Sequence, residues 1–200
     1  MAGAEERVLK RRIASVTNTK KITRAMELIA TTRVAKAQAR AHESRPYAEQ
    51  ITGVIENLAA AGTSVDHPLL QQKSQEEINA VALVVLTSDR GLCGAYNANV
   101  IKAAERELDE IRNDGPQYRL VLVGTKASDY VRVRGYEIAA HFEGMSDRPG
   151  YEDARRVAHT VSDLFQGDVD QVRLIYTQFV SIGTQRVTVR QFLPLVSAET

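Results

Sequence analysis

Apolar and polar positions in the first sixty residues follow a period of three to four. The apolar side chains form three sets with this spacing, namely Leu9, Ile13 and Val16, then Ile22, Met26 and Ile29, then Tyr47, Ile51, Val54 and Leu58. Such spacing places each set on one face of a helix. Strong helix formers dominate the segment, and no glycine occurs from residue 4 until Gly53. We therefore predict one very long helix from Ala4 to about Ala61, which would extend about 80 Å.

Two features interrupt this apolar seam. The polar stretches "TNTKK" and "KAQARAHES" separate the three sets, and between Ala30 and Ala41 the seam consists of alanines. Small residues permit close approach of a second helix, so the seam favours helix-on-helix packing of the coiled-coil type. A solvated helix that merely connects domains is the alternative. Pro46 lacks an amide hydrogen and clashes with the preceding turn, which predicts a kink or a break just before it.

The periodicity changes after a polar linker at residues 62–77. Buried strands are expected at 79–87 and 118–124, further strands at 136–142 and 171–179, and an alternating strand at 184–193. Helices are expected at 97–113, 126–134 and 151–165. Alternating helices and strands are typical of a mostly parallel sheet. We therefore predict an α/β fold class: a long N-terminal shaft helix at residues 1–61 and a Rossmann-like domain at 78–200. The last hairpin, which turns at Gly183, should form an antiparallel edge.

Composition agrees with a folded chain. Of its 200 residues 44% are hydrophobic, which suits one domain with an extended element. The longest apolar run, from Ala80 to Leu86, is far too short to span a membrane. The N-terminus lacks the apolar core of a signal peptide and is acidic at Glu5 and Glu6, so we expect no direct membrane insertion. The single cysteine, Cys93, excludes an internal disulfide.

Charge is unevenly distributed along the chain. Residues 1–50 carry 11 Lys or Arg against 5 Asp or Glu, whereas the remainder carries 15 against 20. A basic first segment indicates an anionic partner, which could be nucleic acid, anionic lipid or acidic protein loops. Its basic residues are not interleaved with aromatic ones, so stacking on single-stranded nucleic acid has no support. A basic helix that contacts duplex phosphates is retained as a minor alternative.

The stretch "SDRGLCGAYN", Ser88 to Asn97, lies between a predicted strand and a predicted helix. This is where a glycine-rich loop can cradle a phosphate. However, Gly91 and Gly94 form only GxxG, because Asp89 occupies the position of the first glycine in GxGxxG and no GK[ST] follows. We therefore predict a structural turn without nucleotide or other cofactor, in which Asp89 and Arg90 cap the following helix and pair with neighbours.

Cys93 is a possible nucleophile in the same loop. Thiol catalysis requires a base within hydrogen-bond reach, and His42, His67, His141 and His159 show no partner motif. A buried structural thiol beside Leu92 is favoured, and a nucleotide- or thiol-dependent α/β enzyme that uses Ser88–Asn97 remains the alternative function. The histidines also lack metal-ligand spacing such as HExxH, so no metal site is predicted.

Two longer stretches together resemble one family. "RRIASVTNTKKITRAMELIATTRVAKAQAR", Arg11 to Arg40, and "SDRGLCGAYNANV", Ser88 to Val100, are similar to the gamma subunit of the F-type ATP synthase, bacterial type. The resemblance implies a non-catalytic central-stalk rotor that couples proton flow to ATP synthesis. The first helix would be half of a shaft that rotates inside the alpha/beta ring. The α/β domain would be a foot beside the epsilon subunit and the membrane c-ring, at the cytoplasmic face of the cell membrane.

The resemblance also implies roles for individual residues. Those expected to contact partners and transmit torque are Lys20, Lys21, Ile22, Thr23, Ala25 and Met26. Those expected to shape the foot are Asp89, Arg90, Gly91, Leu92, Cys93 and Gly94. In this family a second long C-terminal helix returns along the first, whereas this sequence ends at "LPLVSAET". We therefore expect a fragment or a truncated form whose seam is the surface for that helix. The cysteine pair of chloroplast relatives is absent.

Overall fold

A computed structural model describes residues 2–60 and 67–195. The chain divides into two compact units, Met1–Ala61 and Gly62–Thr200. Residues 62–66 of the predicted linker and the C-terminal residues 196–200 lie outside the described residues. The rest of the predicted linker contains two short 3-10 helices, η1 (Pro68–Leu70) and η2 (Gln75–Glu77).

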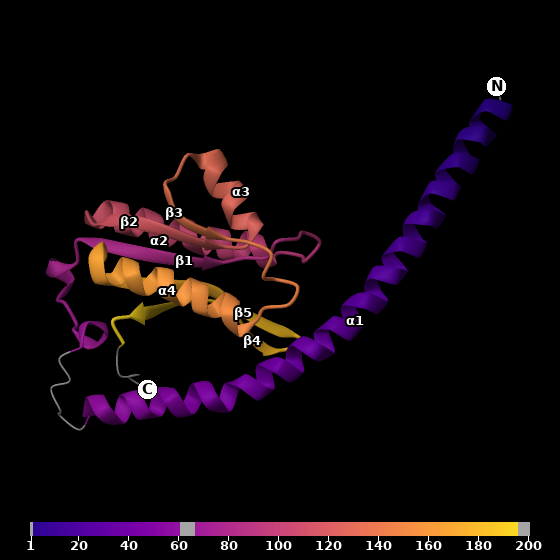
Figure 1. The fold of residues 1–200 in the computed structure, drawn as a ribbon. Helices are drawn as coiled ribbons and strands as arrows, with labels where there is room; N and C mark the ends of the chain where they lie inside the picture. Colours follow the sequence, from indigo (N-terminus) through magenta and orange to yellow (C-terminus); the bar gives the residue numbers. More distant parts are fainter. Residues whose placement is uncertain (1, 61–66, 196–200) are drawn as a thin grey trace. The chain divides into compact units, whose positions relative to one another are not determined.

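The first unit is a single helix, α1 (Ala2–Ala60), of 59 residues (Figure 1). The predicted long helix is therefore confirmed. From residue 3 to residue 51 every side chain is exposed except that of Gln38, which is half-buried. We call the exposed large apolar side chains of α1 the apolar ridge: Val8, Leu9, Ile13, Val16, Ile22, Met26, Leu28, Ile29, Val34, Tyr47, Ile51 and Val54. Across residues 2–60 and 67–195, no helix is both long and apolar enough to cross a membrane.

Pro46 lies inside α1, and the helix continues on both sides of it. Of the two predicted forms the break is therefore wrong, whereas a kink is compatible with a continuous helix and stays a prediction. Proline removes one amide donor, the partner of the His42 carbonyl, while the bonds of the neighbouring turns remain available. In a helix this long, one lost bond does not outweigh the continuous series of bonds on either side.

The second unit contains one five-stranded sheet in the order β3-β2-β1-β4-β5. The strands are β1 (Ala80–Leu86), β2 (Gln117–Val123), β3 (Ile138–Phe142), β4 (Gln171–Ser181) and β5 (Thr184–Leu193). β3, β2, β1 and β4 are parallel, and β5 pairs antiparallel with β4. The predicted parallel sheet with an antiparallel edge hairpin is confirmed.

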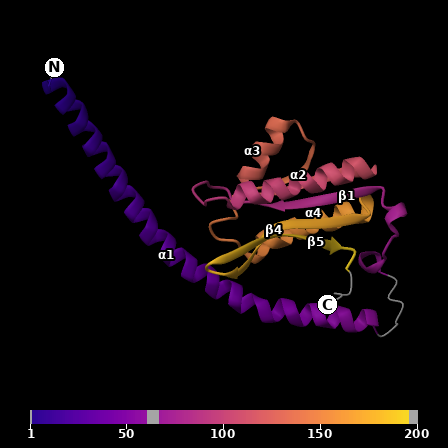
Figure 2. The ribbon, with the colours of Figure 1, turned by 180° about the vertical axis from the view of Figure 1, so that it is seen from behind.

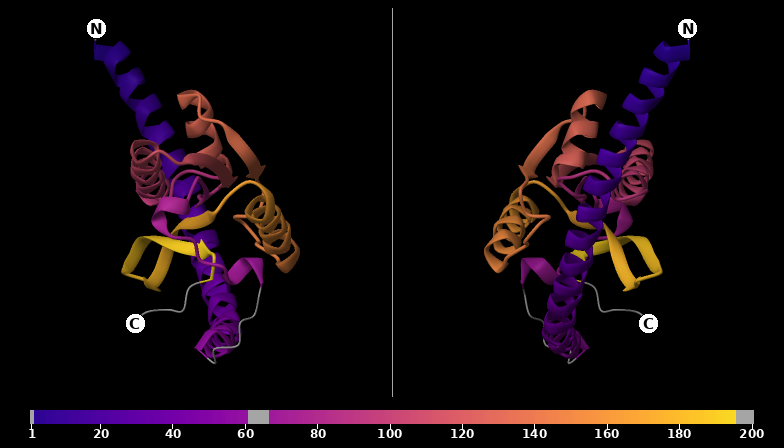
Figure 3. Two further views of the ribbon diagram at one scale, coloured as in Figure 1. Left: turned by 90° about the vertical axis from the view of Figure 1, so that its left-hand side faces the viewer. Right: turned by 90° about the vertical axis from the view of Figure 1, so that its right-hand side faces the viewer.

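Helices cover both faces of this sheet. Figures 2 and 3 show α2 (Tyr96–Asp114) and α4 (Tyr151–Gly167) on opposite sides of the strands. The shorter α3 (Thr125–Arg134) packs on the same face as α2. Because the strands are buried on both faces, they appear in the sequence as continuous apolar runs rather than as alternating ones.

The two cores use alternate residues of the central strand. Val81, Leu83 and Val85 of β1 pack under α2 and α3, where their partners include Val100 and Leu108. On the other face, residues 80, 82 and 84 of β1 join Val161 of α4 and Val172 of β4. α2 ends where Gly115, at φ 102°, donates its amide hydrogen to the carbonyl of Ile111, the left-handed ending that glycine favours. Both cores therefore converge on β1, whose carboxyl end leads into the loop that follows.

Candidate functional site

The loop between β1 and α2 is held by Asn97, in the first turn of α2. The Asn97 side-chain oxygen accepts from the amide of Ser88 at 2.9 Å, and its nitrogen donates to the carbonyl of Arg90 at 3.3 Å. Leu92 and Gly94 both adopt φ 60°, a left-handed conformation that is uncommon for residues other than glycine. These contacts make the loop an internally bonded turn.

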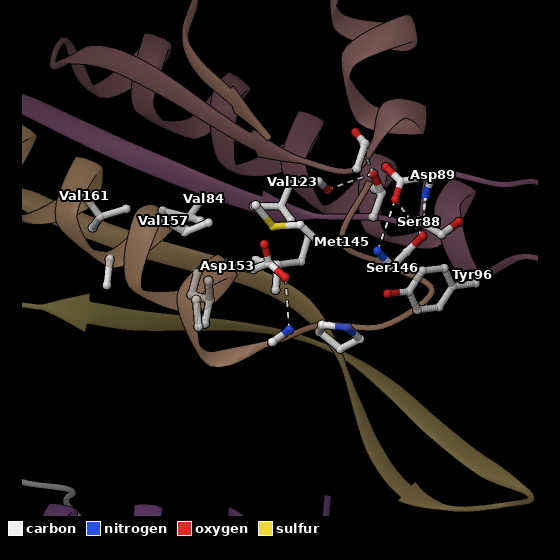
Figure 4. A pocket seen from close by; sticks show the side chains of 18 of the residues that line it. Val84, Ser88, Asp89, Tyr96, Val123, Met145, Ser146, Asp153, Val157 and Val161 are labelled. Carbon is white, nitrogen blue, oxygen red and sulfur yellow. Dashed lines mark hydrogen bonds between the residues drawn. The ribbon is translucent and has the colours of Figure 1, made fainter. Parts of the chain in front are cut away.

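Asp89 connects three loops at the carboxyl end of the sheet. One carboxylate oxygen accepts from the amide and the hydroxyl of Ser146, at 3.1 and 2.7 Å. The other accepts from the amide and the hydroxyl of Thr125, both at 3.2 Å. Figure 4 shows the Asp89 side chain beside Ser146. Thr125 begins α3, so Asp89 caps α3. The prediction that Asp89 caps α2 is wrong, because the N-cap of α2 is Ala95, which has no side-chain capping bond.

These hydrogen bonds determine the charge of Asp89. Burial by itself would raise the pKa of Asp89, but the hydrogen bonds from Ser146, Gly144 and Thr125 to its ionised form outweigh burial and lower the pKa to about 2. The carboxylate is therefore negatively charged throughout the physiological range of pH.

Arg90 and Cys93 of this loop have different surroundings. Arg90 pairs with Asp147 through a nitrogen–oxygen contact of 2.7 Å, as the prediction of local pairing requires. Cys93 is exposed and Leu92 is 92% exposed, so the predicted burial of the thiol is wrong. Residues 90–95 of the loop are all exposed, and none belongs to either core. The cysteine sulfur accepts from the Asn97 amide at 3.1 Å, and no histidine of the described residues contacts it.

Gly124 and Thr87 form the tightest backbone contact of this region. Gly124 adopts φ 97°, and a Cβ atom there would lie 2.3 Å from the Thr87 carbonyl oxygen. The Thr87 hydroxyl accepts from the amide of Ala127 in α3 at 3.0 Å, and the Gly124 amide donates to the Phe142 carbonyl at 2.8 Å. The ends of β1, β2 and β3 are thereby fixed against one another.

A cavity of about 690 Å³ lies beside this network, between α4 and the carboxyl ends of β1 and β2 (Figure 4). We call it the α4 cavity. Its aliphatic lining includes Val84 and Leu86 of β1, Val157 and Val161 of α4, and Met145. Polar side chains at one end include Ser88, Asp89, Tyr96 and Ser146, and Asp153 lies nearer the middle, beside Met145 (Figure 4). Within residues 2–60 and 67–195, no group of three or more His, Cys, Asp or Glu is placed to hold a metal ion.

The predicted contact residues of the first segment all lie on α1 and are all exposed: Lys20, Lys21, Ile22, Thr23, Ala25 and Met26. Ile22 is 61% and Met26 is 44% exposed, one helical turn apart. The Thr23 hydroxyl donates to the Lys20 carbonyl at 3.1 Å. Among the ion pairs of the described residues, none involves Lys20 or Lys21. Their ammonium groups are therefore available to an acidic partner.

Sequence reasoning missed several residues that build the site. Thr125 and Ser146 bond Asp89 across 36 and 57 residues of sequence. Thr87 and Gly124, which bond each other, are 37 residues apart. A local signal existed for Gly124 only, as a glycine between a buried strand and a helix that begins with Thr125. The loop residues Asp89, Arg90, Gly91, Leu92, Cys93 and Gly94 follow the carboxyl end of the central strand β1.

Comparisons with known proteins agree on one family. A family model described as ATP synthase matches residues 5–200. The ATP synthase gamma chain of Parafrankia sp. (strain EAN1pec) is 44% identical over 204 residues, covering 100% of this chain and 67% of the relative. That of Frankia casuarinae is 43% identical, with the same coverage. The chain thus spans about two thirds of the length of these relatives.

The fold is similar as well. The central stalk and c-ring structure of the Tetrahymena thermophila mitochondrial ATP synthase contains a chain that superposes with a TM-score of 0.68 at 25% sequence identity. The superposition covers 86% of this chain and 72% of that chain. Sequence and structure therefore agree, and the chain belongs to the ATP synthase gamma-chain family.

Proposed function

We propose that this chain is the central-stalk rotor subunit of a proton-translocating F-type ATP synthase. In this proposal residues 1–61 are half of a shaft inside a ring of alpha and beta subunits, 62–77 are a linker, and 78–200 are the foot. The observation that carries the proposal is the apolar ridge, because twelve large apolar side chains of α1 remain exposed in the unit to which they belong. Family membership and the likeness to a central stalk support the same conclusion.

The ridge requires a partner on energetic grounds. Burying one large aliphatic side chain stabilises an assembly by about 1.5–3 kcal/mol, so leaving a row of them in water is costly. A helix of this length is also not stable by propensity alone and depends on packing along one face. A second helix along the ridge and a surrounding ring of protein would bury these side chains and supply the packing.

Torque would pass through the contacts of α1 with the ring. Lys20 and Lys21 offer cations to acidic loops of the beta subunits. Thr23 and Ala25 have small side chains, which can slide past the ring. Ile22 and Met26 supply apolar contacts that slide without fixed hydrogen bonds. Rotation would present different faces of the shaft to the three beta subunits in turn, so that each nucleotide site changes affinity with the face it meets.

The second unit would serve as the foot of the rotor and would carry no catalytic group. The bonds of Asp89 fix the loop of Arg90, Gly91, Leu92, Cys93 and Gly94 against the rest of the sheet, which gives a rigid body through which torque can pass. Its proposed partners are the epsilon subunit and the membrane c-ring, at the cytoplasmic face of the bacterial cell membrane. The alternative enzyme function has no supporting observation, because no base contacts the Cys93 sulfur among the described residues.

Co-expression with alpha and beta subunits tests the proposal. A tagged chain should retain both subunits on an affinity column, whereas the double variant Lys20→Glu, Lys21→Glu should retain at least ten-fold less. The matched control is Lys102→Glu, an exposed lysine of α2 in the other unit. Failure of the unaltered chain to retain either subunit would contradict the proposal. Tight ATP or NAD binding by the isolated chain in calorimetry would favour the enzyme instead.

A further inference from the structure

We propose that the α4 cavity binds a small, mainly apolar molecule that is neutral or cationic. The cavity occupies a position where open α/β sheets commonly hold ligands. The connection that leaves β1 passes through α2 on one face to β2, whereas the connection that enters β4 passes through α4 on the other face. The crevice outside the carboxyl ends of the strands at such a switch point is the usual ligand position. The proposal is independent of the rotor function.

The lining indicates an apolar occupant. Val84 and Val161 are 2% exposed and Met145 is 8% exposed, so these residues form a buried apolar floor. Ala154, Ala158 and Phe192 are exposed and form part of the rim. Figure 4 shows Val84, Val157 and Val161 along one end and Met145 near the centre. A volume of about 690 Å³ falls within the range of about 300–1,000 Å³ that is typical of small-molecule sites. The flexible thioether of Met145 can adjust to an occupant.

The charges among the lining residues disfavour anions. Asp89 and Asp153 both line the cavity, and no Lys, Arg or His is among its lining residues. The oxygens of Asp89 already accept four hydrogen bonds, and those of Asp153 accept from the Gly150 amide at 3.0 Å and from Arg156 at 2.7 Å. A phosphate or carboxylate would therefore meet the Asp89 carboxylate and the Asp153 carboxylate, of which only Asp153 is paired with a cation, and no lining cation would attract it, which disfavours nucleotides and fatty acids.

One polar group remains to orient a ligand. The Tyr96 hydroxyl lies at the polar end and points into the cavity (Figure 4). Among the described residues no group forms a hydrogen bond with this hydroxyl, so it can donate to or accept from a ligand. The volume of the cavity suits a small molecule, and the nearly inaccessible Val84 and Val161 offer such a molecule an apolar floor.

Methionine methyl groups give a selective readout. The chain contains 3 methionines, of which Met145 lines the cavity and Met26 lies on the apolar ridge. In a sample labelled at the methionine methyls, indole and tryptamine should shift the Met145 signal in a saturable manner. Indole-3-acetate, which has the same apolar body with a negative charge, should bind at least ten-fold more weakly. Movement of the Met26 signal would report separate binding on the ridge.

Two variants test whether the response comes from the cavity. Ala158→Trp adds bulk at a lining position of α4, and it should weaken indole binding at least ten-fold. Ala98→Trp is the matched control on an exposed position of α2 outside the lining, and it should change the affinity less than two-fold. If Ala158→Trp alters the Met26 signal or fails to fold, Ala154→Trp at a second lining position replaces it.

Three results with the isolated chain would overturn the proposal. They are a Met145 signal that no probe shifts saturably, equal binding of indole-3-acetate and tryptamine, and indole binding that survives filling of the cavity. The titration is then repeated with the chain assembled with its partner subunits. Loss of the Met145 response there would identify the cavity as a protein contact, which also overturns the proposal, and retention of the response supports it.

Discussion

Gly124 lies so close to Thr87 that no side chain fits between them. A Cβ atom at Gly124 would lie 2.3 Å from the Thr87 carbonyl oxygen and 2.6 Å from its carbonyl carbon. Both contacts are to backbone, which cannot rotate away, and the φ of 97° is itself unfavourable for other residues. The ends of β1 and β2 therefore approach each other only because position 124 is glycine.

Replacing this glycine should destabilise the α/β unit strongly. We expect Gly124→Ala to lower the free energy of unfolding by about 3 kcal/mol or more, because strain in φ adds to a steric overlap. Denaturant unfolding followed by circular dichroism measures this. Gly167→Ala is the control, since Gly167 ends α4 with nothing within 4 Å of a Cβ. Similar stability of the two variants would show that the contact relaxes at little cost.

Asp89 should contribute more to stability than an ordinary surface carboxylate. Asp89→Asn turns one acceptor oxygen into a donor that faces the donors of Ser146 or Thr125, so we expect a loss of about 1–3 kcal/mol in the free energy of unfolding. The control Asp129→Asn removes only an exposed pair with Lys126 at 3.6 Å, for which we expect a change within about 0.5 kcal/mol. If both variants unfold at the same denaturant concentration, Asp89 contributes no more to stability than Asp129, which contradicts the prediction.

The contribution of Asp89 should disappear in acid. Its folded pKa of about 2 lies below the ordinary value of 3.8, so ionisation favours the folded state. The stabilisation is complete above about pH 4 and decreases as pH falls through 2. It amounts to at most about 2 kcal/mol, and nearer 1 kcal/mol because solvent screens part of it. Unfolding of the natural chain and of Asp89→Asn between pH 6 and pH 2 should therefore converge, whereas parallel curves would contradict the assignment.

The sequence predicted the elements of the α/β unit well because each depends on local pattern. The apolar run from Ala80 to Leu86 indicates a strand buried on both faces, and the spacing of Val100, Ala104, Leu108 and Ile111 indicates the buried face of α2. These signals arise from neighbours in sequence, and tertiary packing reinforced them rather than opposing them.

The details of the site could not be predicted in the same way. Asp89 precedes α2, so local reasoning assigned it to that helix, yet its partners Thr125 and Ser146 are brought to it by the parallel pairing of β1 and β2 and by the loop after β3. The burial of Cys93 was predicted from its residue type, whereas residues 90–95 of the loop are all exposed and belong to neither core. The α4 cavity is lined by residues of β1, β2, β4, β5, α2 and α4 and of the loops between them, so no single stretch of sequence contains it.

The apolar ridge should matter for partners and not for the chain alone. Ile22 is 61% exposed, so Ile22→Asn removes little buried surface, and we expect a change within about 0.5 kcal/mol in the unfolding of the chain. The same variant should retain several-fold less alpha and beta subunit in co-expression. Ile182→Asn, at a position that is 76% exposed in the other unit, is the matched control and should retain them normally. Equal retention would remove Ile22 from the proposed contact.

Pro46 should be the weakest point of α1. It removes the amide that would bond the His42 carbonyl, and a proline inside a helix costs about 3 kcal/mol relative to alanine. Pro46→Ala should therefore slow amide hydrogen exchange in the turns around residues 42–50 several-fold, with little change in the α/β unit. Arg45→Ala changes the adjacent exposed position without restoring an amide, so it should leave exchange within about two-fold. If amide exchange around residues 42–50 is as slow in the natural chain as in Pro46→Ala, packing rather than backbone hydrogen bonding stabilises the helix there.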